Sequence, residues 1–269
     1  MIYTLTHDTT IENVLRNELH LGKKYVHALR MAKAVSVNDE LVSWTATLPA
    51  STELVIAVPV ATSSYVTNDT PLTIAFEDEH LLVVNKPQNM PTHPNEPGQN
   101  NTCMNAVMKY TDGYAEHVHR LDEGTGGLLV IAKNPIVKAA LDAALANNKV
   151  TRKYTAVVEG VLRKKQGVIT KGIGKDRHHG SRRIISNAGQ KATTHYSVLA
   201  QTAATTTVEL TLETGRTHQI RVHMASIGHP IVGDTLYGAQ PRGNTYALQA
   251  TTVGFTHPIT HQKLTITKK

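Results

Sequence analysis

The segment of residues 117–134, HVHRLDEGTGGLLVIAKN, places three glycines directly before a short apolar run. The run at residues 128–133 has the length of a buried strand. Glycine lets the backbone turn sharply or approach another group closely, so EGTGG predicts a tight loop that enters this strand. Asp122 lies on that loop, and loops beside a rigid core often carry reacting groups. From these residues alone, an aspartate that only caps a turn fits equally well.

Composition and charge describe an ordinary globular chain with one strongly basic region. Hydrophobic residues make up 40% and charged residues 18% of the 269 positions, which predicts one large domain beside a smaller one. The net charge is +7, and residues 149–191 hold twelve Lys or Arg against two acids. A basic region of this size favours a polyanionic partner such as RNA. A solvated basic loop without a partner is the alternative.

Several classes of protein are not expected. No apolar run approaches the roughly 18 residues of a membrane helix, and the N-terminus lacks the basic leader and apolar core of a signal peptide. The single cysteine, Cys103, excludes a disulfide within the chain and a cysteine-rich zinc site. No glycine-rich phosphate loop or dinucleotide fingerprint is present. We therefore expect a cytoplasmic protein without a membrane partner and without a nucleotide cofactor.

Residues 1–70 are predicted to form a small N-terminal α/β module. Thr9 and Glu12 have the spacing of a capping box, which predicts a helix that ends near Leu19. A second helical pattern covers residues 23–31.

Short strands and a linker complete this module. VSVN at residues 35–38 and LVIAVPV at residues 54–60 have the character of strands. The polar residues 61–71 predict a linker. The module carries five basic and seven acidic groups, which argues against affinity based on phosphate contacts.

Residues 71–269 are predicted to form a larger α+β domain. Residues 72–86 indicate two strands around an acidic turn, and Asn134 precedes a proline in the manner of a helix cap. RKYTAVVEG at residues 152–160 alternates as a strand does. Residues 217–227 have helical spacing of their apolar side chains.

Several of these segments resemble the RluA-type pseudouridine synthases. The family signature usually reads HRLD, two variable residues, TSGLLL and an alanine-lysine pair, and here Gly126 stands in place of the serine. Further segments are similar to family motifs, in the same order: NKPQNMPTHP at residues 85–94, the K-A-x-T-x-Y-x-V-L pattern at residues 191–199 and LETGRTHQIRVHMASIGHPIVGDTLYG at residues 212–238. The small module resembles a degenerate form of the RNA-binding module that often precedes this domain.

The resemblance implies a fold, a reaction and a site. The fold is α+β, with a central mixed, mostly antiparallel sheet and a cleft. The reaction converts uridine in structured RNA to pseudouridine, without a cofactor. In the site, Asp122 is the catalytic carboxylate, Tyr154 supplies an aromatic ring, and Arg221 pairs with Asp122 across 99 positions of sequence.

A carboxylate suits this reaction, in which the bond between ribose and uracil breaks, the base rotates, and the base rejoins the ribose through carbon. A carboxylate can attack the sugar or the base, or stabilise positive charge on the ribose, and the sequence leaves these routes open. Arg221 is expected to keep Asp122 ionised. Tyr154 is expected to stack on uracil and to help remove the proton from carbon 5. The target nucleotide must leave its stack to reach them.

The side chains expected to contact RNA are basic or lie in the matched loops: Arg120, Lys153, Arg216, Lys86, His93, Arg182 and Arg183. Ribosomal RNA is the favoured substrate and transfer RNA is possible. The oligomeric state stays open.

Two other functions are compatible with parts of the sequence. One is a non-catalytic RNA-binding protein on the same fold, although such a protein need not keep Asp122, Tyr154 and Arg221. The other is a metal-dependent hydrolase in which His117 and His119 bind a metal together with Asp122, with His218 and His223 as further ligands. Fifteen histidines make chance pairs common, so we expect no metal site.

Overall fold

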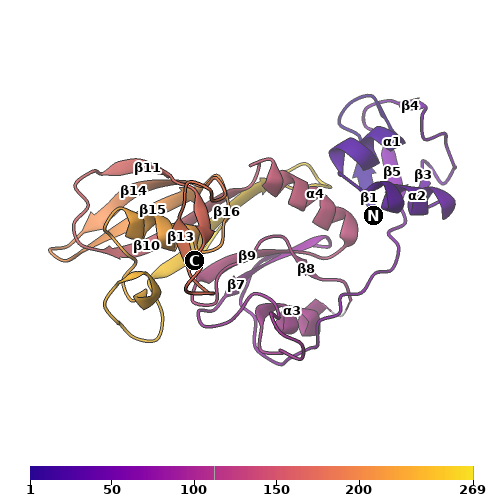
Figure 1. The fold of residues 1–269 in the computed structure, drawn as a ribbon. Coiled ribbons are helices and arrows are strands. Elements are labelled where there is room, and N and C mark those ends of the chain that lie inside the picture. The colour runs from indigo at the N-terminus through magenta and orange to yellow at the C-terminus, as the bar shows by residue number, and fades with distance from the viewer. Residues whose placement is uncertain (112, 269) are drawn as a thin grey trace.

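The structure is a computed structural model that describes residues 1–111 and 113–268. It consists of a small N-terminal part beside a larger α+β part (Figure 1). The small part contains a three-stranded antiparallel sheet in the order β1 (Ile2–Thr4), β5 (Glu53–Ile56), β3 (Val35–Ser36), and a ladder of β2 (Thr9–Thr10) with β4 (Thr47–Leu48). Its helices are α1 (Ile11–Asn13), which continues as the π-helix η1 (Val14–Glu18), and α2 (Lys23–Met31).

The first helix begins one residue later than the predicted capping box implies. Thr10 is the N-cap, and its hydroxyl accepts a hydrogen bond from the Asn13 backbone N–H at 3.1 Å. Thr9 is buried, and its hydroxyl accepts from the Asn13 side chain instead. Glu12 pairs with Arg30 at 3.1 Å. The predicted pair of Thr9 and Glu12 is therefore wrong, whereas α2 has the predicted bounds.

The larger part is built on one mixed sheet of ten strands. The strand order is β11 (Gln166–Thr170), β14 (Thr193–Gln201), β15 (Thr205–Leu212), β10 (Thr151–Glu159), β16 (Leu248–Thr256), β9 (Gly126–Ala132), β7 (Leu81–Lys86), β6 (Ile74–Glu77). Two more strands extend it: β17 (Lys263–Thr267) beside β16, and β8 (Glu116–His117) beside β9. The pairing of β16 with β9 is parallel and the other described pairings in this sheet are antiparallel, which confirms the predicted fold class.

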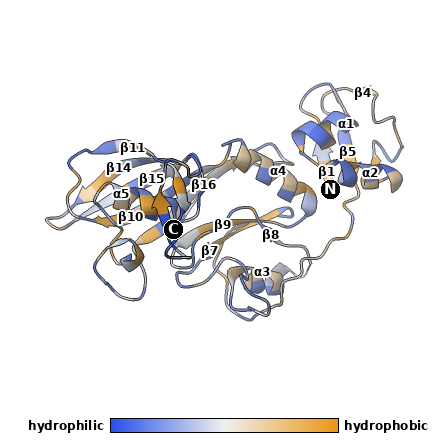
Figure 2. Cartoon of the chain, viewed as in Figure 1, coloured by the Kyte–Doolittle hydropathy of each residue, from blue (hydrophilic) through white to orange (hydrophobic). Residues whose placement is uncertain are grey.

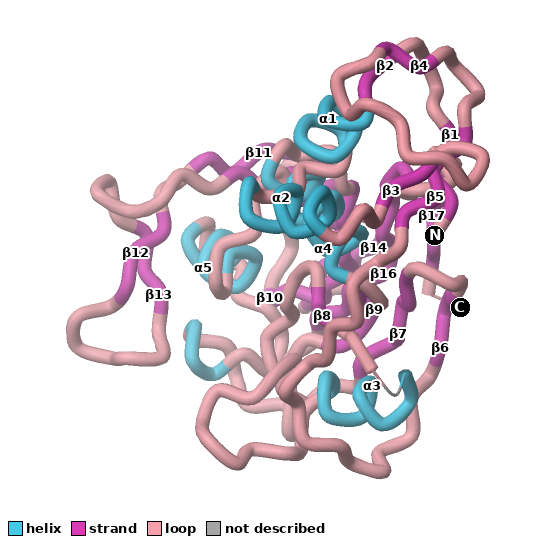
Figure 3. Tube along the Cα trace, turned by 90° about the vertical axis from the view of Figure 1, so that its right-hand side faces the viewer, coloured by secondary structure: helices cyan, strands magenta, loops and turns pink. Residues whose placement is uncertain are grey.

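The helices of the larger part are α3 (Cys103–Thr111), α4 (Pro135–Ala146), α5 (Gln219–Ser226) and the 3₁₀ helix η2 (Thr235–Tyr237). As predicted, Asn134 caps α4, because its side chain accepts from the Val137 N–H at 2.9 Å. A two-stranded hairpin of β12 (Ile173–Lys175) and β13 (Arg183–Ile185) extends away from the body (Figure 3). None of the helices described is long and apolar enough to cross a membrane.

Strands of the main sheet, such as β10, contain strongly hydrophobic residues (Figure 2). Every residue of β9 is buried, as the continuous apolar run predicts, while β10 alternates between buried and half-buried side chains. Tyr154 therefore shares the buried face of β10.

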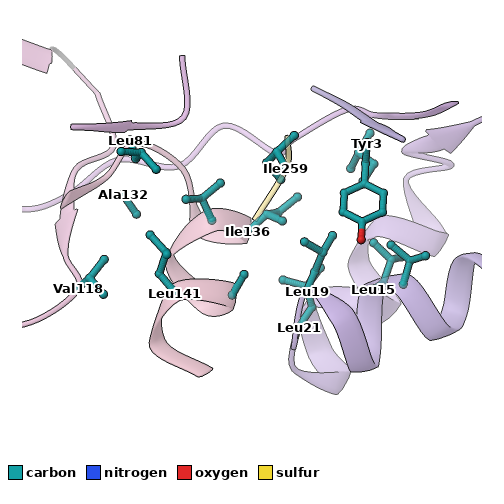
Figure 4. Close-up of a cluster of buried hydrophobic side chains, with 14 of the residues drawn as sticks. Tyr3, Leu15, Leu19, Leu21, Leu81, Val118, Ala132, Ile136, Leu141 and Ile259 are labelled. Carbon is teal, nitrogen blue, oxygen red and sulfur yellow. The ribbon is translucent and has the colours of Figure 1, made fainter. Parts of the chain in front are cut away.

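One apolar cluster joins the small part to the larger one (Figure 4). Leu19 and Tyr3 belong to the same cluster as Ile136 of α4 and Ile259 of the turn between β16 and β17. Tyr3 also packs edge-to-face on His261, with ring centroids 5.0 Å apart. The two parts therefore share buried apolar surface, which opposes their relative motion.

The main sheet has two halves, one running from β11 to β16 and the other from β9 to β6. They meet at β16 and β9, where the glycine-rich loop ends. β16 pairs with β9 at Gln249↔Gly126 and Ala250↔Gly127, and further along β16 pairs with β17 instead. Gly127 has φ +112°, and a Cβ there would lie 2.1 Å from the Ala250 carbonyl oxygen. Glycine is therefore required at this position.

We predict that Gly127→Ala lowers the free energy of unfolding by at least about 2 kcal/mol, because the new methyl group forces β9 and β16 apart. Urea unfolding measures the change. Gly180→Ala is the control: Gly180 is exposed and a Cβ there meets nothing within 4 Å, so its effect should stay below about 0.5 kcal/mol. Equal effects of the two substitutions would contradict this account of the sheet junction.

Candidate active site

Asp122 lies on the loop between β8 and β9, and hydrogen bonds from two other segments fix the main chain of this loop. Thr92 bonds both the N–H and the carbonyl of Leu121, at 3.0 and 2.8 Å. The Gly124 carbonyl accepts from Gln88 Nε2 and from Thr245 Oγ1, each at 3.1 Å. The carboxylate is thus mounted on a rigid support, as the glycine pattern predicts.

Lys86 also supports this loop, from inside the protein. Its Nζ donates to the carbonyl oxygens of Met90, Pro87 and Glu123, at 2.6, 2.9 and 3.2 Å. The side chain is 1% exposed, and burial lowers its pKa to about 8. The predicted RNA contact of Lys86 is inconsistent with this burial. A single sequence could not show it, because lysines are rarely buried.

Arg221 reaches Asp122 from α5, as the resemblance implies. Its Nη1 lies 3.4 Å from Asp122 Oδ2. Its Nε and Nη2 donate to the two oxygens of Asp234, at 2.7 and 2.8 Å. Arg221 and Asp234 are both buried. Burial alone would lower the pKa of Arg221, but the hydrogen bonds to Asp234 raise it, so the guanidinium stays charged beside Asp122.

Two tyrosines complete the surroundings of Arg221. The guanidinium carbon lies 4.4 Å from the ring centroid of Tyr246 and 5.0 Å from that of Tyr237, a geometry that favours a cation. Sequence reasoning missed Asp234 and both tyrosines. Asp234 lies near the end of the matched stretch of residues 212–238, where an acid amid the apolar and glycine residues IVGDTLYG was the available signal.

His218, which the sequence suggested only as a candidate metal ligand, is a further neighbour of Asp122. Its backbone is left-handed, with φ 58°, and its Nε2 lies 3.8 Å from Asp122 Oδ2. Its Nδ1 is 2.8 Å from the Tyr237 hydroxyl, which accepts a hydrogen bond from the Arg183 N–H at 2.9 Å. Burial lowers the pKa of His218 although Asp122 opposes the shift, so the ring is neutral at pH 7.

Asp122 lines two adjoining cavities, which form the predicted cleft. The larger, of about 760 Å³, also contains Tyr154, Leu212 and Leu248 in its wall. The smaller, of about 470 Å³, has Arg221, Asp234 and Tyr246 in its wall. The larger volume lies within the range of about 300–1,000 Å³ that is common for ligand sites. Asp122, Tyr154 and Arg221 are thus brought together.

The predicted RNA-contact residues fall into two groups. Arg120 and Arg216 are exposed at the larger cavity, and Arg120 and His93 line the smaller one. Lys153 and the hairpin arginines lie outside the described walls of both cavities. Lys153 follows Arg152 and precedes Tyr154, so it points to the opposite face of β10, where it pairs with Glu209 at 3.0 Å.

Arg182 and Arg183 belong to the extended hairpin region. Arg182 Nε lies 4.0 Å from an oxygen of Asp176, and its guanidinium lies 5.9 Å from the Tyr237 ring. The hairpin is therefore linked to the surroundings of Asp122 through Tyr237.

The histidines near Asp122 do not form a metal site. Within residues 1–111 and 113–268 there is no group of three or more His, Cys, Asp or Glu arranged to hold a metal. His117 stacks on His93, with centroids 4.7 Å apart, and His119 Nε2 accepts from the Val130 N–H at 3.3 Å. The donor set of a metal-dependent hydrolase is not assembled here.

Comparison with known proteins gives consistent matches. A family model described as RNA pseudouridylate synthase matches residues 80–226, and one described as RluD ribosomal pseudouridine synthase N-terminal domain matches residues 2–54. The uncharacterized RNA pseudouridine synthase YhcT of Bacillus subtilis is 41% identical over 259 residues, covering 93% of this chain and 86% of the relative.

Two further matches extend this comparison. The ribosomal large subunit pseudouridine synthase D of Zymomonas mobilis is 37% identical over 217 residues, covering 73% of this chain and 68% of the relative. The solved structure of human RNA pseudouridylate synthase domain containing 1 aligns with a TM-score of 0.65 at 24% identity, covering 75% of this chain and 84% of that one. That likeness shows a common fold.

The buried histidines predict a loss of stability in acid. Burial lowers the pKa of His117 to about 4 and that of His119 to about 3. In the unfolded chain a histidine titrates near about 6.5, so below that pH the unfolded chain binds more protons. Each histidine should then remove about 1.4 kcal/mol of unfolding free energy per pH unit, until the pH reaches its folded pKa. Urea unfolding between about pH 7 and about pH 5 measures this slope.

His119→Gln isolates one contribution, because glutamine can still accept from the Val130 N–H. The slope should become shallower by about 1.4 kcal/mol per pH unit. His178→Gln, which changes an exposed histidine, should leave the slope unchanged. If both variants keep the slope of the parent, His119 does not remain neutral in the folded chain.

Proposed function

The chain belongs to the RNA pseudouridylate synthase family, and we propose that Asp122 is the carboxylate with which it isomerises uridine. The enzyme is an RNA pseudouridine synthase, and RNA is its substrate. The observation that carries the assignment of Asp122 is its position in the wall of a cavity shared with Tyr154, 3.4 Å from a buried, charged Arg221.

Asp234 determines how Arg221 meets the reacting carboxylate. It occupies Nε and Nη2 of the guanidinium, so Nη1 is the group directed at Asp122, and the contact is to Oδ2. The other oxygen, Oδ1, is proposed to act on the nucleotide. Attack on the sugar, attack on the base and stabilisation of positive charge on the ribose all require an ionised carboxylate in a fixed position.

Tyr154 is proposed to stack on the uracil. Its buried ring lies in the wall of the larger cavity, together with the apolar side chains of Leu212 and Leu248. Burial raises the pKa of Tyr154, so the tyrosinate is scarce at neutral pH. This favours the stacking role over removal of the proton from carbon 5.

The target uridine must be extruded from its stack to reach this cavity. Arg120 and Arg216 are exposed at the cavity and are proposed to bind the RNA backbone there. His93 lines the smaller cavity, and the basic hairpin that carries Arg182 and Arg183 would bind RNA further from the reacting base.

We propose ribosomal RNA of the large subunit as the substrate. The support is the similarity to the ribosomal large subunit pseudouridine synthase D of Zymomonas mobilis and the match of residues 2–54 to the RluD ribosomal pseudouridine synthase N-terminal domain. We also propose that residues 1–70 form a module attached to a catalytic domain of residues 71–269, and that the protein acts in the cytoplasm, where ribosomal RNA is modified.

The test is pseudouridine mapping in a strain that lacks this protein, complemented with the parent or with Asp122→Asn. One or a few sites in ribosomal RNA should vanish on deletion, and the parent should restore them. Asp122→Asn keeps the size of the side chain but loses its charge, so it should restore none, a loss of at least about 1,000-fold in rate. Glu123→Gln, an exposed neighbour on the same loop, is the control and should restore every site.

Restoration by Asp122→Asn would refute the role of Asp122. Loss of sites in transfer RNA alone would refute the ribosomal substrate but keep the reaction. If no site changes on deletion, RNA binding without catalysis becomes the better account.

A further inference from the structure

Arg152 is a buried cation that has no role in the reaction described above. It lies on β10 two residues before Tyr154, on the same face, and it lines the larger cavity. Its side chain is only 7% exposed. Its Nε has no hydrogen-bond partner among the residues that the structure describes.

The contrast with Arg221 shows how unusual this arrangement is. Arg221 is equally buried, but two carboxylates surround it. Burial lowers the pKa of Arg152, and the group that opposes this shift is the Tyr154 hydroxyl rather than a carboxylate. A buried charge without a counter-ion is strongly unfavourable. Burial of the Arg152 charge therefore lowers the stability of the folded chain, and the described residues do not offset this loss.

The neighbouring loop leaves room for this guanidinium. A Cβ on Gly215 would lie 2.6 Å from Arg152 Nη1. Gly215 precedes Arg216 in the loop between β15 and α5, which forms one wall of the larger cavity. Because Gly215 has no side chain, the Arg152 guanidinium stays uncovered at the cavity wall.

A second unpartnered donor lies in the same cavity. His119 Nε2 accepts from the Val130 N–H, so the ring proton is on Nδ1. Nδ1 is buried and forms no hydrogen bond of normal geometry with the described residues, although the backbone of Arg120 is close enough to act on the pKa of the ring. His119 also lines the larger cavity, and the charge of Arg152 is among the causes that lower its pKa. A guanidinium and a ring N–H in one wall match an anion with several acceptor oxygens.

We propose that Arg152, assisted by His119, binds a backbone phosphate next to the uridine that occupies the larger cavity. This inference rests on the proposed function, because Asp122 and Tyr154 line the same cavity and the anion must belong to the same ligand as the base. A ribonucleotide within a chain has a phosphate on each side of its ribose. The phosphate then supplies the counter-ion that the protein lacks, so the site selects a uridine within an RNA chain over free uridine.

The test compares Arg152→Met with the parent in two measurements, thermal unfolding and affinity for a short single-stranded oligouridylate. Methionine fills a similar volume without charge, so the variant should unfold at a higher temperature than the parent. Its Kd should be at least about 10-fold weaker, and the slope of log Kd against log salt should be smaller by about 0.7, the value for one lost phosphate contact in single strands. Greater stability together with weaker binding is the signature of a cation held for a ligand.

Two further variants keep the test decisive. Lys263→Met removes an exposed charge from β17, outside both cavities, and should leave Kd within about two-fold. Arg152→Lys retains the charge and should bind within about five-fold of the parent, since lysine also binds phosphate. If Arg152→Met is less stable than the parent and binds the oligouridylate equally well, the arginine is structural and the proposal fails.

Activity separates this failure from failure of the proposed function. Pseudouridine formation is measured on total RNA from the deletion strain, which contains both ribosomal and transfer RNA. A parent that forms none refutes the function, whatever Arg152 does. A parent that is active, together with an Arg152→Met variant that matches its rate at low RNA concentration, refutes the phosphate site alone.

Discussion

The array of Asp234, Arg221 and Asp122, in which Asp234 and Arg221 are buried and Asp122 faces the cavities, is the interaction on which the site depends. Arg221 and Asp234 are almost fully excluded from solvent, so breaking their paired hydrogen bonds would leave a buried charge uncompensated. The array also joins α5 to the loop before β9, which are 99 residues apart in sequence. A carboxylate held in this way does not need to be reoriented when substrate enters, which is the condition for electrostatic catalysis.

This array lies where the two halves of the main sheet meet, at β9 and β16. β9 and β16 are parallel and closely apposed at Gly127 and Ala250, and β16 then turns to pair with β17. The loop before β9 and the loop before α5 open on this junction and line both cavities. The shared apolar cluster anchors the small part to α4, on the larger part that carries the site.

Local signals in the sequence predicted the elements that depend on local physics. The cap of α4 at Asn134 and the alternation of β10 are of this kind. The short strands β1 and β17 were not predicted, because three and five residues carry too little periodicity. Lys86 was assigned to the surface and Asp234 was not singled out, because their environments are set by carbonyls and a guanidinium that only the tertiary fold supplies. The family resemblance brought in Arg221, which no local pattern identifies.

We propose that the geometry of Arg221, and not merely its charge, makes Asp122 reactive. The direct measurement is the single-turnover rate constant of Arg221→Lys on saturating ribosomal RNA from the deletion strain, with RNA affinity measured in parallel. Lysine keeps the charge but cannot reach both oxygens of Asp234 and Asp122 together. The account predicts a rate constant at least about 100-fold lower, with Kd within about three-fold. A rate constant within about two-fold of the parent would contradict it.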